Sequence, residues 1–256
     1  MVRLLITADE ELGSGSSREL IEYAAAECAA VLVFEASSDG GALKTGRKGT
    51  SIYQLVIEGR AAHAGLEPEK GVNATVEIAH QILAISALAD PALGTTVTPT
   101  RMISGETSNT VPARAELSID VRARSVAELK RVDRAMRALQ GSLPGSLLQL
   151  HGGINRPPLE AKASAALYQL SCQVAIELGI APTGYAEVGG ASDGNFTAGL
   201  GIPTLDGLGA VGGGAHAQNE HVDLSAMPER TALAAGLIQR LLEGQLHHFD
   251  ESEVPQ

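Results

Sequence analysis

The sequence predicts an α/β protein in which one domain is interrupted by another. The 256-residue chain opens with strand, helix and strand, a rhythm typical of a parallel sheet covered by helices. Over residues 46–155 the pattern changes to strand, helix, two strands, helix and strand, the order of a ferredoxin-like domain. The α/β style then returns. We therefore expect one domain to consist of residues 1–45 with 156–256, and the inserted domain of 46–155.

The interrupted domain is expected to begin with a buried strand over residues 2–8. Ser16 and Glu19 form a capping box, which predicts a helix that ends near residue 29. A second buried strand is expected over residues 31–35. Further helices are expected over about 164–178 and 227–242.

The inserted domain carries the clearest alternation in the chain. Leu117, Ile119 and Val121 alternate with polar residues, so we expect their strand to bury one face. Ser125 and Glu128 form a capping box that predicts a helix directly after it. The expected strands are 51–59, 95–102, 116–123 and 146–151, and a further helix is expected over about 72–88.

Composition and charge exclude several classes of protein. Hydrophobic residues make up 44% and charged residues 19%, which is a globular composition. The net charge of −11 argues against binding to nucleic acid or to an anionic membrane. No apolar run approaches the roughly 20 residues of a membrane span, and the first residues do not form a signal peptide. The compartment is unknown, with the cytoplasm as the default. Two cysteines, Cys28 and Cys172, exclude a disulfide scaffold and a Cys-rich zinc site.

Carboxylates follow both strands expected near the start of the chain. Glu10 and Glu11 come after the first strand, and Glu35 ends the second. The carboxyl ends of parallel strands share one edge of a sheet, and close acids repel unless a cation offsets their charge. Each acid alone is more simply a solvated strand end, but the set favours a metal site. His216, in a Gly-rich loop, would complete an oxygen-plus-imidazole ligand set typical of zinc.

Two other motifs compete with a metal site. Residues 207–212 match G-x-G-x-x-G, but no helix begins behind them to hold a pyrophosphate, so a dinucleotide site is rejected. Residues 190–194 match a nucleophile elbow around Ser192, and Asp206 and His216 follow in a serine-hydrolase order. This alternative stays open, although little chain separates the three residues and the acids near the start of the chain are left unexplained.

Several motifs occur together in an order seen in one family. They are residues 9–14, 34–35, 62–65 with 71–74, 108–112, 120–122 and the Gly-rich run that ends at His216. In this respect the chain resembles, over nearly its whole length, the dinuclear-zinc metallopeptidases of family twenty. That family includes carboxypeptidase G-type glutamate carboxypeptidases, aminoacylases, and acetylornithine and succinyl-diaminopimelate deacylases. The resemblance is closest to the glutamate carboxypeptidases.

The resemblance implies a role for each residue of the interrupted domain, which would be the catalytic domain. Glu10 would be the general base that deprotonates a water between two zinc ions. Glu11 and His216 would bind one zinc ion, and Glu35 would bind the other. The substrate would be a small peptide or an N-acyl amino acid, cleaved at an amide bond next to a free carboxylate.

The inserted domain resembles the family's lid, which pairs two copies into a homodimer. His63 would bind the carbonyl oxygen in the partner's site as charge develops there. Asn109 and Arg122 would hold the substrate carboxylate, with Arg156 as a second candidate, because an arginine fork matches a carboxylate. For Arg122, a solvated strand face is an equally good interpretation.

The start of the chain departs from the family pattern. The family places a His-x-Asp motif and a metal-bridging Asp upstream of the Glu10–Glu11 pair, and here Glu10 is the tenth residue. We therefore expect an N-terminally truncated chain with an intact lid, an incomplete catalytic domain and no activity by itself. A non-catalytic dimerising remnant is the third interpretation.

Overall fold

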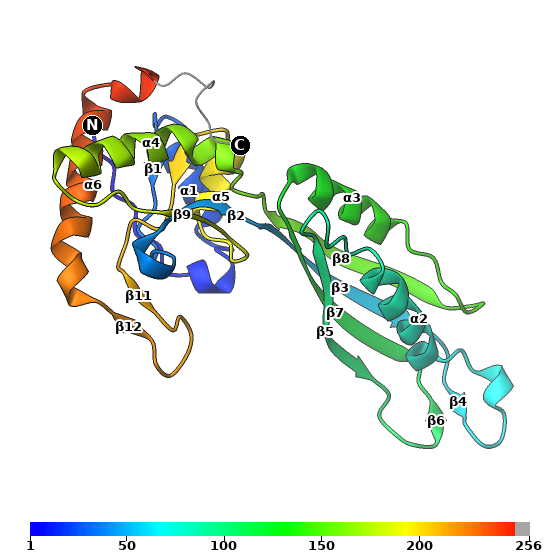
Figure 1. Ribbon diagram of the computed structural model, residues 1–256. Coiled ribbons are helices and arrows are strands. Elements are labelled where there is room, and N and C mark those ends of the chain that lie inside the picture. The colour runs from blue at the N-terminus through cyan, green and yellow to red at the C-terminus, as the bar shows by residue number, and fades with distance from the viewer. Residues whose placement is uncertain (249–256) are drawn as a thin grey trace. The chain divides into compact units, whose positions relative to one another are not determined.

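The computed structural model describes residues 1–248 and divides the chain into two units (Figure 1). The first unit comprises Met1–Lys48 and the described residues from Arg156 onward, and the second comprises residues 49–155. Both units combine helices with strands, so the predicted α/β class is confirmed. Among the residues described, no helix is long and apolar enough to cross a membrane.

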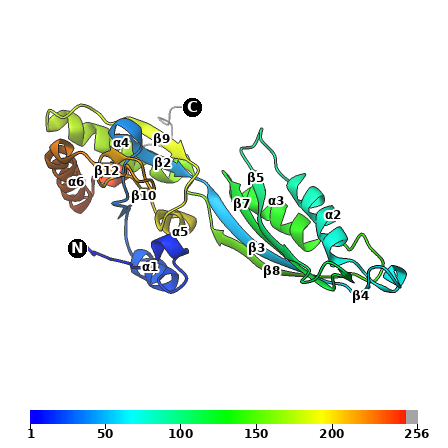
Figure 2. The ribbon, with the colours of Figure 1, turned by 90° about the horizontal axis from the view of Figure 1, so that it is seen from below.

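The second unit is a four-stranded sheet with two helices on one face (Figures 1 and 2). The strands lie in the order β5-β7-β3-β8, and β7 runs antiparallel to both of its neighbours. This is the ferredoxin-like order that the sequence predicts. The elements are β3 (Gly49–Glu58), α2 (Ala74–Ser86), β5 (Thr96–Ser104), β7 (Arg114–Ala123), α3 (Val126–Arg137) and β8 (Leu147–Arg156), with a short antiparallel pair of β4 (Ala62–His63) and β6 (Thr110–Val111).

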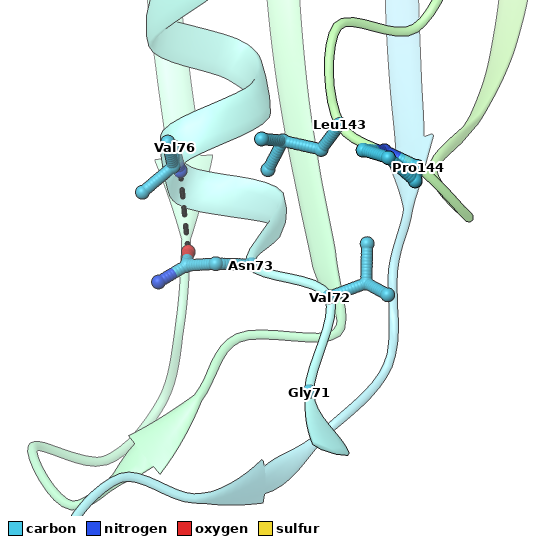
Figure 3. A pocket seen from close by; sticks show the side chains of 6 residues that line it. All are labelled: Gly71, Val72, Asn73, Val76, Leu143 and Pro144. Atoms are coloured by element: carbon cyan, nitrogen blue, oxygen red, sulfur yellow. Dashed lines mark hydrogen bonds between the residues drawn. The ribbon is translucent and has the colours of Figure 1, made fainter. Parts of the chain in front are cut away.

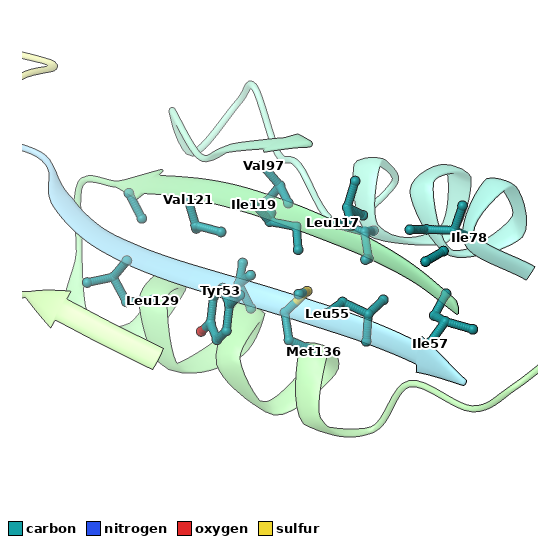
Figure 4. Packing of buried hydrophobic residues seen from close by; sticks show 14 of the residues in the cluster. Tyr53, Leu55, Ile57, Ile78, Val97, Leu117, Ile119, Val121, Leu129 and Met136 are labelled. Atoms are coloured by element: carbon teal, nitrogen blue, oxygen red, sulfur yellow. The ribbon is translucent and has the colours of Figure 1, made fainter. Parts of the chain in front are cut away.

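The core of this unit lies between the sheet and its helices (Figure 4). Leu117, Ile119 and Val121 of β7 are at most 1% exposed, which confirms the predicted alternation. The Ser125 hydroxyl accepts a 3.2 Å hydrogen bond from the amide of Glu128, as expected of a helix cap. Facing residues from the other elements are Tyr53, Leu55, Ile57, Ile78, Ile85, Leu129, Val132 and Met136.

The first unit is built from paired short strands packed against helices. β1 (Val31–Leu32) pairs in parallel with β10 (Thr204–Leu205), and β2 (Leu43–Arg47) pairs in parallel with β9 (Tyr185–Val188). β11 (Gly212–Gly213) and β12 (His221–Val222) form an antiparallel pair. The helices are α1 (Arg18–Ala25), α4 (Ala161–Glu177), α5 (Gly194–Gly199) and α6 (Met227–Leu242). The core residues come from β2, β10, α4, α6 and the residues after β10: Leu43, Leu167, Leu170, Val174, Ala175, Leu205, Leu208, Leu233 and Leu237.

The strand predicted over residues 2–8 is wrong. This run forms no strand, and Leu4 and Ile6 are 81% and 84% exposed. A strand requires a neighbour that accepts and donates its backbone hydrogen bonds. No segment of residues 1–248 pairs with this run, so its apolar side chains stay on the surface.

The capping box predicted at Ser16 and Glu19 is also wrong. The first turn of α1 begins at Arg18, and the helix ends at Ala25, before the expected residue 29. The Asp9 carboxylate instead accepts hydrogen bonds from the amide and hydroxyl of Ser16, at 2.9 and 2.6 Å. These bonds, together with those from Ser17, hold the pKa of Asp9 well below its usual range.

Candidate functional site

Glu11 and His216 come together from opposite ends of the chain. Glu11 lies in a single 3₁₀ turn, η1 (Glu10–Leu12), and His216 lies in the loop between β11 and β12. The Nε2 atom of His216 is 3.8 Å from Oε2 of Glu11, and both side chains are exposed. The backbone of His216 has φ of 62°, a left-handed conformation that is uncommon outside glycine. An imidazole and a carboxylate this close are two donors that one divalent ion can share.

Glu10, next to Glu11, turns toward a buried arginine. Nη2 of Arg156 lies 3.2 Å from the Glu10 carboxylate and donates a 3.1 Å bond to the Glu10 carbonyl oxygen. Burial raises the pKa of Glu10. Arg156 opposes that rise, while the negative charges of Glu35, Asp193 and Glu11 add to it. A carboxylate with a raised pKa accepts a proton more readily near neutral pH, which suits a general base.

The guanidinium of Arg156 is held by the protein's own groups. It donates to the Ser14 hydroxyl at 2.6 Å and to the Asp193 carboxylate at 3.2 Å, and it stacks over the Phe196 ring. Asp193 also accepts hydrogen bonds from the hydroxyls of Ser14 and Thr7. Sequence reasoning assigned no role to Ser14 or Asp193. No local pattern marks them, because their partners lie from 37 to 186 residues away in the sequence.

Glu35 is placed near these groups but does not complete a metal site. It follows β1, is half-buried, and its carbonyl oxygen accepts a 2.8 Å bond from the Gly209 amide. The negative charge of Glu35 raises the pKa of Glu10. It also opposes the lowering of the Lys44 pKa, which burial causes. Within residues 1–248, no three His, Cys, Asp or Glu side chains are close enough to hold one metal ion. The described residues thus offer one metal ion two ligands, Glu11 and His216.

The serine-hydrolase alternative is contradicted. Ser192 is 1% exposed, and its hydroxyl donates to Asp206 at 2.5 Å and accepts from the Gly194 amide at 3.1 Å. His216 is exposed at the surface, and none of the described histidines bonds to Ser192. A serine nucleophile needs an accessible hydroxyl with a base beside it. Ser192 instead stabilises the buried Asp206.

The glycines of residues 207–212 are not directly followed by an α-helix, as the sequence predicts. Gly209 packs against the backbone of Phe34 and Glu35, and Gly212 begins strand β11. The next α-helix in the described chain is α6, which starts at Met227, so no helix N-terminus follows the glycines.

In the second unit, His63 and Asn109 come together at the β4–β6 strand pair. His63 pairs with Thr110, and the Ala64 amide donates a 2.9 Å bond to the Asn109 carbonyl oxygen. Both side chains are exposed. The Gly65 amide donates to Nδ1 of His63 at 3.1 Å. A neutral ring therefore carries its proton on Nε2, which is then a free hydrogen-bond donor.

Arg122 lies far along β7 from the β4–β6 strand pair. Its guanidinium makes bonds of 2.8 and 2.9 Å to the two carboxylate oxygens of Asp120. Arg122 pairs with Thr50, whereas the β4–β6 strand pair joins the sheet near the paired residues Glu58 and Arg114. Eight residues of extended strand correspond to roughly 27 Å. In the described chain Arg122 pairs with Asp120, and its role as a substrate ligand stays a prediction.

A shallow pocket of about 360 Å³ lies at the start of α2 and contains none of the predicted site residues (Figure 3). The Asn73 side chain in its wall caps α2 by accepting a 3.2 Å bond from the Val76 amide. No titratable side chain lines it, so it offers no chemistry. Its lining residues are Gly71, Val72, Asn73, Val76, Leu143 and Pro144.

Comparison with known proteins identifies similar sequences for both units. Residues 45–143 match the family model of the M20 peptidase dimerisation domain. The chain is 35% identical over 252 residues to carboxypeptidase G2 of Pseudomonas sp. (strain RS-16), covering 95% of the chain and 60% of that protein. It is 25% identical to the succinyl-diaminopimelate desuccinylase of Helicobacter hepaticus, over 88% of the chain and 59% of that enzyme. The chain thus spans about 60% of the length of these relatives.

Solved structures show the same fold. The aminopeptidase PepT of Bacillus cereus superposes with a TM-score of 0.71 at 22% identity, over 93% of this chain and 63% of that one. A dinuclear metal-binding peptidase of the M20 family from Bacillus subtilis superposes with a TM-score of 0.65 at 16% identity, over 91% and 63%.

Proposed function

We propose that the chain is part of a zinc-dependent hydrolase that cleaves amide bonds next to a free carboxylate. The proposal starts from its homology with the M20 peptidases and from the match to their dimerisation domain. The names of two relatives, carboxypeptidase G2 and a p-aminobenzoyl-glutamate hydrolase of Escherichia coli, suggest a glutamate conjugate as substrate. The latter is 38% identical over 95 residues, which are 36% of this chain and 22% of that protein.

The approach of Glu11 to His216 is the observation that carries this proposal. Residues from opposite ends of the chain place a carboxylate oxygen and an imidazole nitrogen 3.8 Å apart. Two ligand atoms of one tetrahedral zinc ion lie about 3.3 Å apart, so the Glu11 and His216 side chains need only a small approach to share one ion. We assign these two residues to one zinc ion and Glu35 to a second. Bound zinc would activate water and polarise the scissile carbonyl.

Glu10 is assigned the role of general base. Its carboxylate is next in sequence to the proposed ligand Glu11, and Arg156 holds it through both side chain and backbone. Burial raises its pKa, which makes the carboxylate a stronger base toward a proton of water. The charge of Arg156 opposes that rise and favours the ionised carboxylate, which is the form that a general base needs.

The second unit would supply substrate contacts. The Gly65 amide fixes the His63 ring so that Nε2–H can donate to a carbonyl oxygen as charge develops. Asn109, beside the same strand pair, would hold the substrate carboxylate. Arg122 and Arg156 would contribute only after leaving Asp120 and Asp193, with which they now pair. The matched dimerisation domain supports a homodimer.

We also propose that the described residues alone do not turn over substrate. They bring two donors to one metal, and the other two ligands of a tetrahedral zinc would have to come from elsewhere. A non-catalytic dimerising role is the second candidate. It is favoured because the second unit has all the strands and helices of its fold, whereas the first unit supplies only part of a zinc ligand set.

Calorimetric zinc titration of the full chain tests the ligand assignment. We expect weak binding that falls at least tenfold in Glu11→Gln and in His216→Ala and stays unchanged in Glu220→Gln, an exposed acid of the same loop. Two tightly bound zinc ions per chain would contradict the partial site. Unchanged zinc affinity in His216→Ala would contradict the pairing.

Hydrolysis of an N-acyl glutamate tests the activity. We expect no turnover by the chain alone, with or without zinc. Chelator-sensitive turnover would show that the ligand set is sufficient, and turnover that survives chelation but is lost in Ser192→Ala would revive the serine mechanism.

A further inference from the structure

Two residues of the first unit have a strained backbone. In the described part of the chain, the residues other than glycine with a positive φ are Ser14, at 56°, and His216, at 62°. This left-handed conformation is unfavourable for a residue with a side chain, and such residues gather at functional sites, where the surrounding contacts hold them in place. His216 is a proposed zinc ligand, whereas the proposed reaction gives Ser14 no role. The strain at Ser14 therefore calls for an explanation of its own.

The Ser14 hydroxyl lies between an arginine and a carboxylate. It donates to Oδ1 of Asp193 and accepts a 2.6 Å bond from Nη2 of Arg156. The same Nη2 lies 3.2 Å from Oδ1 of Asp193, so the three side chains form a closed triangle. Ser14 is fully buried, and Arg156 is 7% exposed. The Thr7 hydroxyl holds the other oxygen of Asp193 at 3.0 Å, so the triangle is fixed on its outer side as well.

The nitrogen at the corner of this triangle also contacts Glu10 twice. Nη2 of Arg156 lies 3.2 Å from the Glu10 carboxylate and donates a 3.1 Å bond to the Glu10 carbonyl oxygen. The guanidinium is stacked 5.2 Å from the centre of the Phe196 ring. Its Nε is buried and finds no hydrogen-bond partner among the described residues. A guanidinium placed for stability alone would satisfy this donor, so the contacts of Nη2 are favoured at the expense of Nε.

We propose that Ser14 is a positioning residue, which together with Asp193 holds Arg156 against Glu10. The proposal rests on the role of Glu10 as general base. A base must point at the proton that it removes, and a misplacement of about 1 Å can lower a rate by about 100-fold. In this role Arg156 stays with Asp193, whereas a role as ligand of the substrate carboxylate would require it to leave.

The alternative is that Ser14 serves only the turn in which it lies. Its amide donates to the Asp9 carbonyl oxygen and its own carbonyl oxygen accepts from the Arg18 amide, both at 2.9 Å, so its backbone joins η1 to α1. Glycine adopts a positive φ without strain and can make both backbone bonds. The variant Ser14→Gly therefore keeps the turn and removes the hydroxyl, which separates the two roles.

Carboxyl labelling of the full chain tests the proposal. A water-soluble carbodiimide with glycinamide modifies accessible carboxylates, and tandem mass spectrometry locates the label within the tryptic peptide of residues 4–18. In the wild type we expect Glu11, whose side chain is 75% exposed, to react faster than Glu10. In Ser14→Gly and Ser14→Ala the rate at Glu10 should rise roughly threefold or more, because a hydrogen bond that restrains Arg156 is lost. The rate at Glu11 should stay the same.

Two further variants provide matched controls. Ser16→Ala removes the hydroxyl that donates a 2.6 Å bond to Asp9, so it should raise labelling at Asp9 and leave Glu10 unchanged. Arg156→Lys keeps the charge but loses the branched guanidinium. It should raise labelling at Glu10 by itself, and Ser14→Gly should add nothing in that background, since Ser14 acts through Arg156.

Three outcomes would overturn the proposal. Wild-type labelling of Glu10 in Ser14→Gly would show that Ser14 serves only the turn. An equal effect of Ser14→Gly with and without Arg156→Lys would show that Ser14 does not act through the arginine. A joint rise at Asp9, Glu10 and Glu11 would show that the turn unfolds. The zinc titration and the hydrolysis assay test the proposed function separately, so its failure would leave the labelling result in place.

Discussion

Arg47 and Asp206 form a buried ion pair that joins β2 to the end of β10. The guanidinium donates through Nε at 2.7 Å and Nη2 at 3.2 Å to the two carboxylate oxygens of Asp206. The two side chains are 5% and 0% exposed. Asp206 also accepts from the Ser192 hydroxyl, so the residue that resembled a nucleophile is part of this network. Arg47 lies two residues before the second unit begins.

Replacement of Asp206 by Asn should strongly destabilise the first unit. The change leaves the Arg47 charge buried without its counter-ion, a loss of about 3–5 kcal/mol for pairs of this kind. Urea unfolding followed by circular dichroism would measure it. The matched control is Asp120→Asn, which breaks the solvated pair with Arg122 and should cost far less. Equal losses in the two variants would contradict the importance of the buried pair.

A fall in pH should weaken the attachment of the loop after α3, which the Glu77 carboxylate holds through hydrogen bonds. Glu77 is fully buried, which raises its pKa, but bonds from the Ser142 and Leu143 amides and from Gln81 and Ser146 outweigh burial and lower the pKa overall. A carboxyl whose folded pKa lies below its unfolded pKa stabilises the fold above the unfolded value, about 4.3. That stabilisation declines as pH falls below this value toward the folded pKa.

The variant Glu77→Gln isolates this carboxyl. At pH 7 we expect it to lose about 1–3 kcal/mol of unfolding free energy, because several donors lose a charged acceptor. The difference from wild type should shrink between pH 5 and pH 3. A difference that is constant over this range, measured by urea unfolding at each pH, would mean that the carboxyl does not act through its charge.

The ring of His63 should carry its proton on Nε2 when neutral, because the Gly65 amide occupies Nδ1. Nitrogen-15 NMR of the full chain above the titration range would identify the tautomer from the ring shifts. Gly65→Pro removes the amide hydrogen and should produce a mixture of tautomers. A wild-type ring protonated on Nδ1 would contradict the proposed donor role.

Trypsin should cleave after Arg3 well before it cleaves within α3. Residues 1–8 form no helix or strand, whereas the residues around Arg131 lie in a helix packed on a buried core. Proteolysis of a site requires local unfolding, which is easiest in exposed segments with few buried contacts. Mass spectrometry of a time course would check the order. Simultaneous cleavage at both sites would indicate that residues 1–8 are protected in solution.

Local patterns were sufficient to predict the second unit. The alternation of Leu117, Ile119 and Val121 and the cap at Ser125 concern residues close in sequence, and both are found. Each element there also has its sheet neighbours and covering helices within residues 49–155. Propensity, burial and pairing therefore agree, and the order of elements determines the ferredoxin-like fold.

The first unit depends on contacts that no local pattern carries. An apolar run at residues 2–8 reads as a strand, but a strand also needs a partner, and none of the described residues provides one. The pattern around Ser16 predicts a helix cap, but the Ser16 hydroxyl donates its hydrogen bond to Asp9 instead. Arg156 reads as a substrate ligand, yet Asp193 and Ser14 engage it.

The sequence by itself determined the fold class, the insertion of one fold into another and the residue types available for chemistry. Tertiary structure decided which of those residues come together. Glu11 lies near His216, and His63 lies near Asn109, whereas Arg122 bonds to Asp120. The reason is physical. Secondary structure follows from interactions a few residues apart, whereas a site forms where distant segments converge, and that position is set by the packing of the whole unit.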